Sequence, residues 1–244
     1  MQFYTAKIIF QNNIASMIYH LAVDKNDVKV APGQFYMLKY WDDSLPLMRP
    51  ISVYAVEDHL LHFLYKVVGK GTERLSTLKA GAAIALLGPL GNGFPCHEVS
   101  GKVALVGGGI GIPPLFETAK NLKKRGCKVD IFLGYKDELF ALEPFEELCE
   151  NIFVAAEKGK EGYRGFITDI FNAQNYDAVF TCGPEVMMMK VKKLCDIYNV
   201  PVWLSMENRM ACGIGACLVC TCQTTTGMKR CCKDGPVFSG KLFL

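Results

Sequence analysis

The sequence lacks the features that mark membrane, secreted and nucleic-acid-binding proteins. No apolar run reaches the roughly 20 residues needed to span a bilayer. The first residues, MQFYTAKIIF, contain no basic segment followed by a long apolar one, so we expect no secretory signal and a soluble, cytoplasmic protein. The 27 basic and 24 acidic side chains leave a net charge of +3, too weak and too scattered to predict an anionic partner.

A hydrolytic or acid–base constellation is also missing. We find no convincing Ser/His/Asp set and no carboxylate pair. The four histidines, His20, His59, His62 and His97, have no metal-ligand spacing and are interpreted as surface or core residues. Half of the 244 residues are hydrophobic, which excludes global disorder and provides for a buried core. This length predicts two domains with a small appendage.

Cysteine is the first feature present in an unusual amount. The sequence contains eleven, and an odd number without a secretory signal argues against a disulfide framework. Five of them are scattered and are interpreted as small core residues: Cys96, Cys127, Cys149, Cys182 and Cys195. The other six lie between Cys212 and Cys232, and this concentration requires a separate explanation.

Residues 1–98 have the texture of an antiparallel β-barrel. Short aliphatic and aromatic runs separated by polar, glycine or proline turns predict strands over 6–10, 14–23, 34–40, 51–56, 60–68 and 82–87. One helix is expected near the end of this stretch. Thr72 is its predicted cap, Leu75 and Leu78 share one face, and Gly81 ends it.

Residues 99–205 have the alternating pattern of a parallel α/β domain. An apolar strand over 102–106, a glycine turn, a helix over 114–124 and a strand over 129–133 form a βαβ unit. Strands over 152–156, 178–182 and 202–205 and a helix over 184–198 continue the pattern, so we expect helices on both faces of one sheet. The fold class is therefore multidomain α+β, with residues 206–244 as a small cysteine-rich C-terminal domain.

The cysteines of this tail have iron–sulfur spacing. Cys212, Cys217 and Cys220 fit C-x4-C-x2-C, the spacing of plant-type [2Fe-2S] sites, and a fourth cysteine follows downstream. Gly213 and Gly215 would let the loop backbone approach the cluster and aim N–H groups at its sulfurs. A structural zinc site is the alternative, but its ligand pairs are usually two to four residues apart. Cys222 is spare, and Cys231 competes with Cys232 for the fourth position.

A glycine turn follows the first strand of the α/β region. Gly107, Gly108, Gly109 and Gly111 precede the helix over 114–124, the context of a phosphate-binding turn in which the helix N-terminus offers N–H groups. No acidic residue clearly ends the next strand to hold a ribose, because Asp130 lies near that strand's beginning. The alternative is a tight structural turn.

Three further turns have residues suited to a dinucleotide. Cys182, Gly183 and Pro184 lie between a strand and a helix, where ligands of parallel sheets bind, although Cys182 alone is equally a core cysteine. Arg49 and Ser52 begin a barrel strand and would suit a pyrophosphate and a ring nitrogen. The run from Gly69 to Thr72 is a second phosphate cradle; each of these barrel turns alone would be ordinary.

Together the motifs RPIS, GKGT, GGGIGIPP, CGP and the cysteine tail resemble the ferredoxin reductase superfamily. The tail, MENRMACGIGACLVC followed by CKDGPVF, is similar to that of the electron-transfer subunits of B-type, NAD-dependent dihydroorotate dehydrogenases, and the resemblance covers essentially the whole chain. It implies a role in pyrimidine biosynthesis as an oxidoreductase subunit.

The resemblance also implies ligand sets. Cys212, Cys217, Cys220 and Cys232 would hold the cluster, Cys232 because the family ligand directly precedes the KDGP run. NADH would lie against Gly107, Gly108, Gly109 and Gly111 and near Cys182, Gly183 and Pro184. FAD would be bound by Arg49, Pro50, Ile51, Ser52, Leu64, Tyr65, Lys66, Gly71 and Thr72.

The implied partner is a catalytic FMN-containing dihydroorotate dehydrogenase subunit, in a heterotetramer with two copies of each chain. The length leaves no room for a separate pyrimidine-oxidising barrel, so we expect no dihydroorotate oxidation by this chain alone. Two alternatives stay open at this point. One is a related ferredoxin–NAD(P)H or sulfide reductase subunit, and the other is a zinc-stapled binding module without a redox role.

Overall fold

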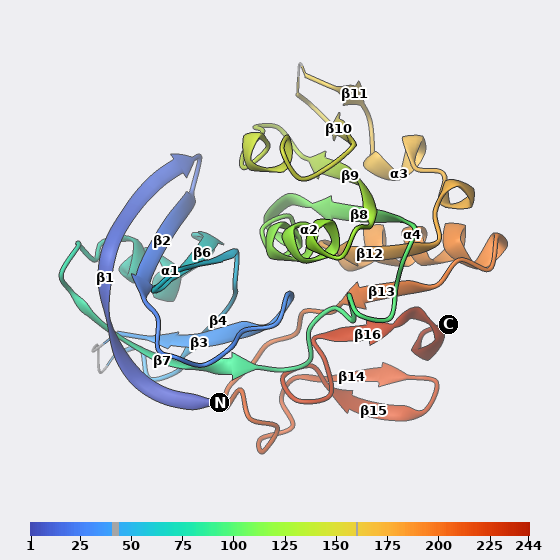
Figure 1. Cartoon of the computed structure of the whole chain (residues 1–244). Coiled ribbons are helices and arrows are strands. Elements are labelled where there is room, and N and C mark those ends of the chain that lie inside the picture. The colour runs from blue at the N-terminus through green and yellow to red at the C-terminus, as the bar shows by residue number, and fades with distance from the viewer. Residues whose placement is uncertain (41–43, 160) are drawn as a thin grey trace.

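The computed structural model describes residues 1–40, 44–159 and 161–244. Figure 1 shows a curled β-sheet on one side, a layered α/β region on the other, and a C-terminal segment that runs beneath both. This arrangement confirms the predicted fold class, an antiparallel barrel-like domain, a parallel α/β sheet and a small cysteine-rich region. No helix among the described residues is long and apolar enough to cross a membrane.

The first region is an antiparallel sheet in the order β4-β3-β7-β1-β2-β6-β5. Its edge strands β4 and β5 follow each other in the chain, so the sheet curls back on itself. The link between them bonds to both sides, since the Val53 N–H donates to the Gln34 carbonyl at 3.0 Å and the Tyr54 N–H to the His62 carbonyl at 2.8 Å. Its strands are β1 (Gln2–Ala15), β2 (Ile18–Asp24), β3 (Phe35–Lys39), β4 (Arg49–Ser52), β5 (Ala55–Glu57), β6 (Leu60–Lys66) and β7 (Ala83–Leu90).

The helix of this region, α1 (Lys70–Ser76), starts and ends earlier than predicted. Gly69, not Thr72, is its N-cap, and Thr72 lies within the first turn. The Thr72 hydroxyl accepts hydrogen bonds from the N–H groups of Val68 at 2.9 Å and Gly69 at 3.3 Å. The prediction that Thr72 caps the helix was wrong because a threonine hydroxyl stabilises a helix start equally well by reaching back from the third position.

The second region is a sheet in the order β11-β10-β9-β8-β12-β13-β16, parallel except for the antiparallel β16. Helix α2 (Pro114–Lys124) has the predicted bounds, and α4 (Glu185–Ile197) lies within its predicted range. The other elements are β8 (Lys102–Gly108), η1 (Gly109–Gly111), β9 (Lys128–Tyr135), η2 (Glu143–Phe145), β10 (Asn151–Ala156), β11 (Tyr163–Arg164), α3 (Ile167–Ile170), η3 (Ala173–Asn175), β12 (Ala178–Cys182) and β13 (Val202–Ser205).

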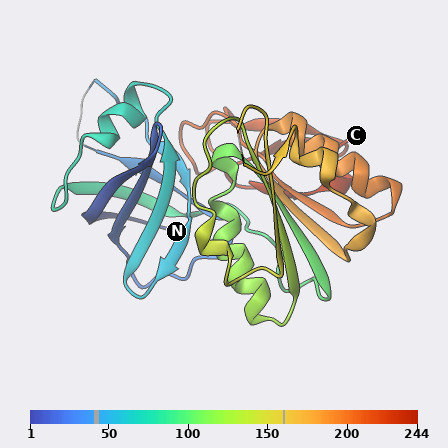
Figure 2. The same cartoon turned by 90° about the horizontal axis from the view of Figure 1, so that it is seen from above.

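Two apolar layers cover the faces of this sheet. Side chains alternate along a strand, so Leu105 of β8 packs with Leu115 of α2 on one face, whereas Val106 packs with Val191 of α4 on the other. The predicted helices on both faces are confirmed. Viewed from above, α2 lies on the side of the α/β region that faces the barrel (Figure 2).

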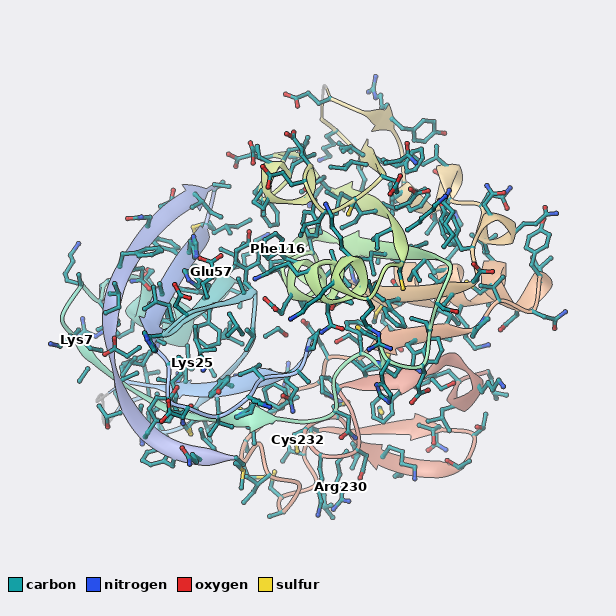
Figure 3. The ribbon with its side chains drawn as sticks, in the orientation of Figure 1. Lys7, Lys25, Glu57, Phe116, Arg230 and Cys232 are labelled. Atoms are coloured by element: carbon teal, nitrogen blue, oxygen red, sulfur yellow. The ribbon has the colours of Figure 1, made fainter. Side chains whose placement is uncertain are left out.

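The barrel and α2 meet through both polar and aromatic contacts. The Val56 N–H donates to the Glu117 carboxylate at 3.0 Å, and the rings of Tyr54 and Phe116 stack with centroids 4.8 Å apart. Figure 3 shows Glu57 and Phe116 on facing sides of this junction. The two regions therefore have a fixed relative placement, on which the candidate site depends.

The C-terminal segment is not separate from the α/β sheet. After β13 it forms a loop, the hairpin of β14 (Thr221–Thr224) and β15 (Gly227–Arg230), then β16 (Val237–Ser239) and η4 (Gly240–Leu242). Strand β16 pairs with β13. The domain boundary at residue 206 therefore stays a prediction.

The remaining cysteines and histidines behave largely as small structural residues. All cysteines of the described chain are free, and Cys96, Cys127, Cys182 and Cys195 are buried. Cys149 is only partly buried. Two histidines distant in sequence meet in the barrel, with His20 Nε2 and His62 Nδ1 3.0 Å apart.

Candidate functional site

The predicted cluster cysteines converge as two contacting pairs. The Cys217 N–H points at Cys212 Sγ at 3.4 Å, and the Cys232 N–H points at Cys220 Sγ at 3.4 Å. The two pairs are adjacent, because the Gly215 N–H also points at the Cys232 thiol and lowers its pKa against the larger raising effect of burial. The four cysteines, from two separate segments, thus lie close together as two adjacent pairs.

Backbone N–H groups make this loop favourable for thiolates. Burial raises the pKa of the Cys212 thiol, but the N–H groups of Cys217, Ile214 and Ala216 and the Cys217 thiol together outweigh burial and bring the pKa to about 6. Gly213 permits the tight turn, with φ of +72°. The predicted aiming of amide groups at sulfur is therefore present in the structure.

The structure separates the two candidates for the fourth cysteine. Burial raises the pKa of the Cys232 thiol, and so does its contact with the Cys220 thiol. Burial also raises the pKa of the Cys231 thiol, but this thiol contacts Cys222 instead. The Cys231 side chain is fully buried in the apolar core, and its N–H donates to the Cys220 carbonyl at 3.0 Å. Cys232 thus contacts Cys220 and lies near Cys212, whereas the contact of Cys231 is with the spare Cys222.

An arginine–carboxylate clamp holds the fourth cysteine beside the loop, and sequence reasoning missed it. Arg230 Nε and Nη2 each donate to the Asp234 carboxylate at 3.0 Å, while Nη1 donates to the Gly215 carbonyl at 3.2 Å. The Arg230 guanidinium lowers the pKa of Asp234 to about 2. Figure 3 shows Arg230 and Cys232 near each other in this segment. An Arg and an Asp four residues apart around two cysteines were the available signal.

The described residues contain no group of three or more His, Cys, Asp or Glu side chains arranged to hold a metal ion in the usual way. The four thiols are instead spread over two pairs. Four thiols in two pairs fit a two-iron cluster, in which each iron takes two protein ligands.

The cysteine loop packs against the barrel. A Cβ at Gly213 would lie 2.6 Å from Met37 Cγ of β3 and 3.2 Å from Leu90 Cδ1 of β7. The segment after Cys232 is tied to the same place, since the Asn92 side chain donates to the Asp234 carbonyl at 3.0 Å. The loop is thus positioned next to β3, which pairs with the strand β4 that begins at Arg49, and next to β7.

The two predicted nucleotide turns come into direct contact. A Cβ at Gly111 would lie 2.5 Å from the Gly183 backbone, and one at Gly108 would lie 2.9 Å from Pro184 Cδ. Gly107 packs against Ile112 and Leu115. These glycines allow close backbone approach, whereas Gly109 has a φ of +52° and open space around its Cα. Cys182 is buried.

The expected contribution of the α2 N-terminus was wrong. Pro113 and Pro114 have no N–H, and the N–H groups of Leu115 and Phe116 already bond to the carbonyls of Ile112 and Pro113. The amide groups left for a phosphate are those of the Gly109–Gly111 turn itself.

The structure brings together two of the predicted flavin residues, Arg49 and Gly71, whereas the Thr72 hydroxyl is bonded within its own turn. The Arg49 guanidinium lies against Gly71, where a Cβ would overlap it, and 5.6 Å from the centre of the Tyr40 ring. The Thr72 hydroxyl is already used at the start of α1. The start of β4 and the first turn of α1 therefore meet at Arg49 and Gly71, where only glycine leaves room for the guanidinium.

The predicted flavin residues of β6 can contribute mainly their backbone groups to a binding site. They are Leu64, Tyr65 and Lys66. Leu64 and Tyr65 are buried, and the Tyr65 hydroxyl donates to Gln11 Oε1 at 2.9 Å inside the barrel. Strand β5 pairs with β6 only as far as His62. The backbone groups of Leu64 and Lys66 on that edge of β6 are therefore not paired with β5 and could bind a ligand.

Three cavities connect these parts. The largest, about 450 Å³, lies at the carboxyl ends of β8, β9 and β10 and includes Gly108 and Gly109. A second, about 290 Å³, includes Lys66 of the barrel together with the glycine turns. A third, about 120 Å³, includes Pro50 and Ser52. Met206 and Glu207, which sequence reasoning missed, line both of the smaller cavities.

Comparisons with known proteins agree with this geometry. The family model for the iron–sulfur cluster binding domain of dihydroorotate dehydrogenase B matches residues 207–243. The chain is 50% identical over 238 residues to a Clostridium acetobutylicum protein named dihydroorotate dehydrogenase B (NAD(+)), electron transfer subunit, covering 97% of this chain and 96% of the relative. A protein of the same name from Clostridium perfringens is 43% identical over 242 residues, covering 98% and 97%.

Solved structures show the same fold. An NADH-dependent reduced ferredoxin-NADP oxidoreductase structure superposes with a TM-score of 0.86 at 30% identity, covering 97% of this chain and 88% of the other. A Neisseria gonorrhoeae ferredoxin NADP+ reductase with bound FAD and NADP has a TM-score of 0.65 at 15% identity, covering 81% and 92%, and supports the fold alone. The chain therefore has an iron–sulfur-binding region on a ferredoxin-reductase-like fold, and it belongs to the family of dihydroorotate dehydrogenase B (NAD+) electron transfer subunits.

Proposed function

We propose that this chain carries electrons between NAD and a catalytic dihydroorotate dehydrogenase subunit, through FAD and a [2Fe-2S] cluster that it holds itself. One observation carries the proposal. The short segment Met206–Met210 lines the cavities beside the glycine turns and beside Ser52, and it leads directly to Cys212. The segment therefore links three parts of the proposed site: the glycine turns, the barrel strand with Ser52, and the cysteine loop.

The groups that we assign supply complementary chemistry when bound, because nicotinamide gives up two electrons together, a flavin accepts them as hydride and an iron–sulfur cluster takes them singly. The residues of this chain bind, orient and shield these groups. No acid–base residue is required of the chain, which agrees with the absence of a catalytic constellation among its predicted sites.

The FAD site that we assign lies on the barrel. Arg49 would hold the pyrophosphate by charge, and Gly71 keeps the backbone close enough for its amide to take part. Ser52 and Pro50 line the small cavity that would receive the ring system, with Met206 on its other side. Leu64, Tyr65 and Lys66 would contribute through the open backbone edge of β6, and Ile51 and Thr72 would support the shape of their turns.

The NAD site that we assign lies at the carboxyl ends of the parallel strands. Gly108, Gly109 and Pro184 line the large cavity there, and Gly183 lines the smaller cavity on the same glycine turns. Gly107 and Gly111 would act by close packing, and Cys182 as a buried support. This edge is where ligands of open parallel sheets bind.

The cluster site that we assign uses Cys212 and Cys217 as one ligand pair and Cys220 and Cys232 as the other. Each pair matches a contact in the structure. Cys217 is exposed, whereas Cys220 and Cys232 are buried. The cluster would therefore reach the surface on one side, as electron transfer to a partner requires.

We further propose three domains at 1–98, 99–205 and 206–244, and a heterotetramer with two copies of the FMN-containing catalytic subunit. The test is an assay of the purified chain with and without that subunit. The chain alone should oxidise NADH with an artificial acceptor and leave dihydroorotate unchanged. Dihydroorotate turnover without the partner would contradict the proposal, and efficient exchange with ferredoxin or a sulfur substrate alone would favour the reductase alternative.

A further inference from the structure

The edge strand β5 of the barrel is covered by side chains of helix α2 rather than by another strand. Val56 is the middle residue of β5, and its N–H donates to Glu117 Oε2 at 3.0 Å. Its carbonyl accepts a hydrogen bond from Lys120 Nζ at 3.3 Å, and the same Nζ lies 3.2 Å from Glu117 Oε2. The three residues therefore form one closed set of contacts across the junction, beside Glu57 and Phe116 in Figure 3.

Apolar contacts surround this set but do not fix how the two regions are aligned. Phe116 stacks on Tyr54, and stacked rings can slide over each other at little cost. Hydrogen bonds, in contrast, weaken steeply when their angle or length changes. The side chains of Glu117 and Lys120 are only 18% and 32% exposed, so water competes little for their bonds. This pair therefore determines where α2 lies along β5.

The contacts lie close to the cavity that joins the two regions. The glycine turn η1 is followed by α2 after two residues, and Glu117 is in the first turn of that helix. On the barrel side, β5 pairs with the beginning of β6, and Lys66 at the end of β6 lines the 290 Å³ cavity together with Gly109 and Gly111. Strand β6 and η1 also contact each other directly. A shift of α2 along β5 therefore changes the width of this cavity.

We infer that Glu117 and Lys120 are positioning residues for hydride transfer from NADH to the flavin, an inference that rests on the proposed function. The described walls of the cavities assigned to the nucleotide and the flavin include neither side chain. The pair acts by holding the glycine turns in one place relative to the barrel. A hydride passes only between rings in contact, and misplacement by about 1 Å can slow such a step by roughly 100-fold.

The test uses the chain with flavin and cluster bound and compares Glu117→Ala with Glu117→Gln. Glutamine keeps an oxygen that can accept from the Val56 N–H, whereas alanine has no acceptor. In Glu117→Ala we expect the limiting rate of flavin reduction by NADH to fall roughly tenfold, because the apolar contacts still hold the regions near their place. The dissociation constant of NAD+ should change by less than about twofold, and Glu117→Gln should retain most of the rate. Stopped-flow absorption and calorimetry measure the two quantities.

Hydrogen exchange of the β5 amides gives a readout that does not depend on activity. The Val56 N–H should exchange faster in Glu117→Ala, because its acceptor is removed, and should stay protected in Glu117→Gln. Lys120→Met is the milder variant for the case that Glu117→Ala does not fold. It removes the bond to the Val56 carbonyl from a partly exposed side chain and should slow the reduction by roughly threefold.

Two control variants change the net charge as Glu117→Ala does. Asp196→Ala removes the carboxylate of the Lys192–Asp196 ion pair on α4. Glu138→Ala removes a second bridge to the barrel, in which the Ser16 N–H donates to the Glu138 carboxylate at 2.8 Å, but both of these residues are exposed. Exposed single contacts contribute little, so both variants should keep the reduction rate within about twofold of the wild type.

The outcomes separate this inference from the proposed function. A wild type that binds no flavin, or whose flavin NADH does not reduce, would defeat the proposed function and this inference with it. Normal reduction of the wild type and the same limiting rate in Glu117→Ala, despite faster exchange at Val56, would overturn the inference alone. Weaker NAD+ binding in Glu117→Ala at an unchanged limiting rate would also overturn it, since the pair would then support binding rather than position the rings.

Discussion

The cysteine loop and the nucleotide cavity form the two ends of the proposed electron path, and the chain builds them in different ways. Three of the four proposed cluster thiols come from nine consecutive residues, Cys212 to Cys220, and the pair of Arg230 and Asp234 holds the proposed fourth beside them. The nucleotide cavity takes its walls from three strands and from α4. The geometry of a site in one loop is set mainly by the sequence spacing of its residues. The geometry of a site at several strand ends is set by how the whole sheet is assembled.

The largest expected effect concerns the cysteine loop. Cys232→Ser should abolish the iron and sulfide content of the anaerobically purified chain, because it removes one of four ligands. Cys231→Ser is the matched control: its thiol contacts Cys222, which is not one of the four proposed ligands, so the cluster should be retained. Iron and sulfide analysis with visible absorption distinguishes them. A cluster lost only in Cys231→Ser would reverse the assignment of the fourth ligand.

The second largest expected effect concerns the two glycine turns beside the proposed nucleotide site. Gly111→Ala places a Cβ 2.5 Å from the Gly183 backbone, so the two turns must separate. We expect reduction of the flavin by NADH to slow by roughly 100-fold, as misplacement of a reacting group by about 1 Å can do. The cluster content should not change. Stopped-flow absorption under anaerobic conditions measures the rate.

Gly126→Ala is the control for that variant. Gly126 has a φ of +82° with open space around it, at the far end of α2. It should cost about 1 kcal/mol of unfolding free energy and leave the NADH rate intact. If both variants slowed reduction equally, the contact between the two glycine turns would have no special role.

The last prediction concerns stability alone and lies at Asp130, near the beginning of β9. Burial raises the pKa of Asp130, but hydrogen bonds from Lys102, Asn151 and Tyr176 outweigh it and leave the pKa below its ordinary value. Asp130→Asn should lower the unfolding free energy by about 2 kcal/mol at neutral pH and change neither cluster content nor NADH reduction.

The pH dependence of that effect has a definite sign. A carboxyl group with a depressed pKa in the folded state stabilises the fold above its unfolded pKa of about 3.9. That stabilisation is lost as the pH falls through the folded pKa. The stability difference between wild type and Asp130→Asn should therefore shrink below about pH 4 in denaturant titrations. A difference that grows on acidification would contradict the role assigned to Lys102, Asn151 and Tyr176.

Local patterns were sufficient for most of the fold. Helix α2 and strands β12 and β13 have their predicted bounds, because each is a continuous apolar or amphipathic run between turn residues. The pairing of β16 with β13 could not be predicted, since a three-residue strand that follows a cysteine loop has no periodicity of its own.

The candidate sites also differ in how far local sequence predicts them. The spacing of Cys212, Cys217 and Cys220 is a local property and could be read directly. Met206 and Glu207 could not be assigned, because their place beside the glycine turns and beside Ser52 depends on how the chain leaves β13. The choice between Cys231 and Cys232 likewise depends on the direction in which the chain leaves β15.

The central claim is that NADH reaches a cluster held by this chain through a flavin held by the same chain. The most direct measurement is an anaerobic titration of the purified chain with NADH, followed by visible absorption and electron paramagnetic resonance. The account predicts about two irons and two sulfides per chain, bound FAD, bleaching of both chromophores and a signal from the reduced cluster. Protein that contains the cluster and flavin but shows no cluster reduction by NADH would contradict it.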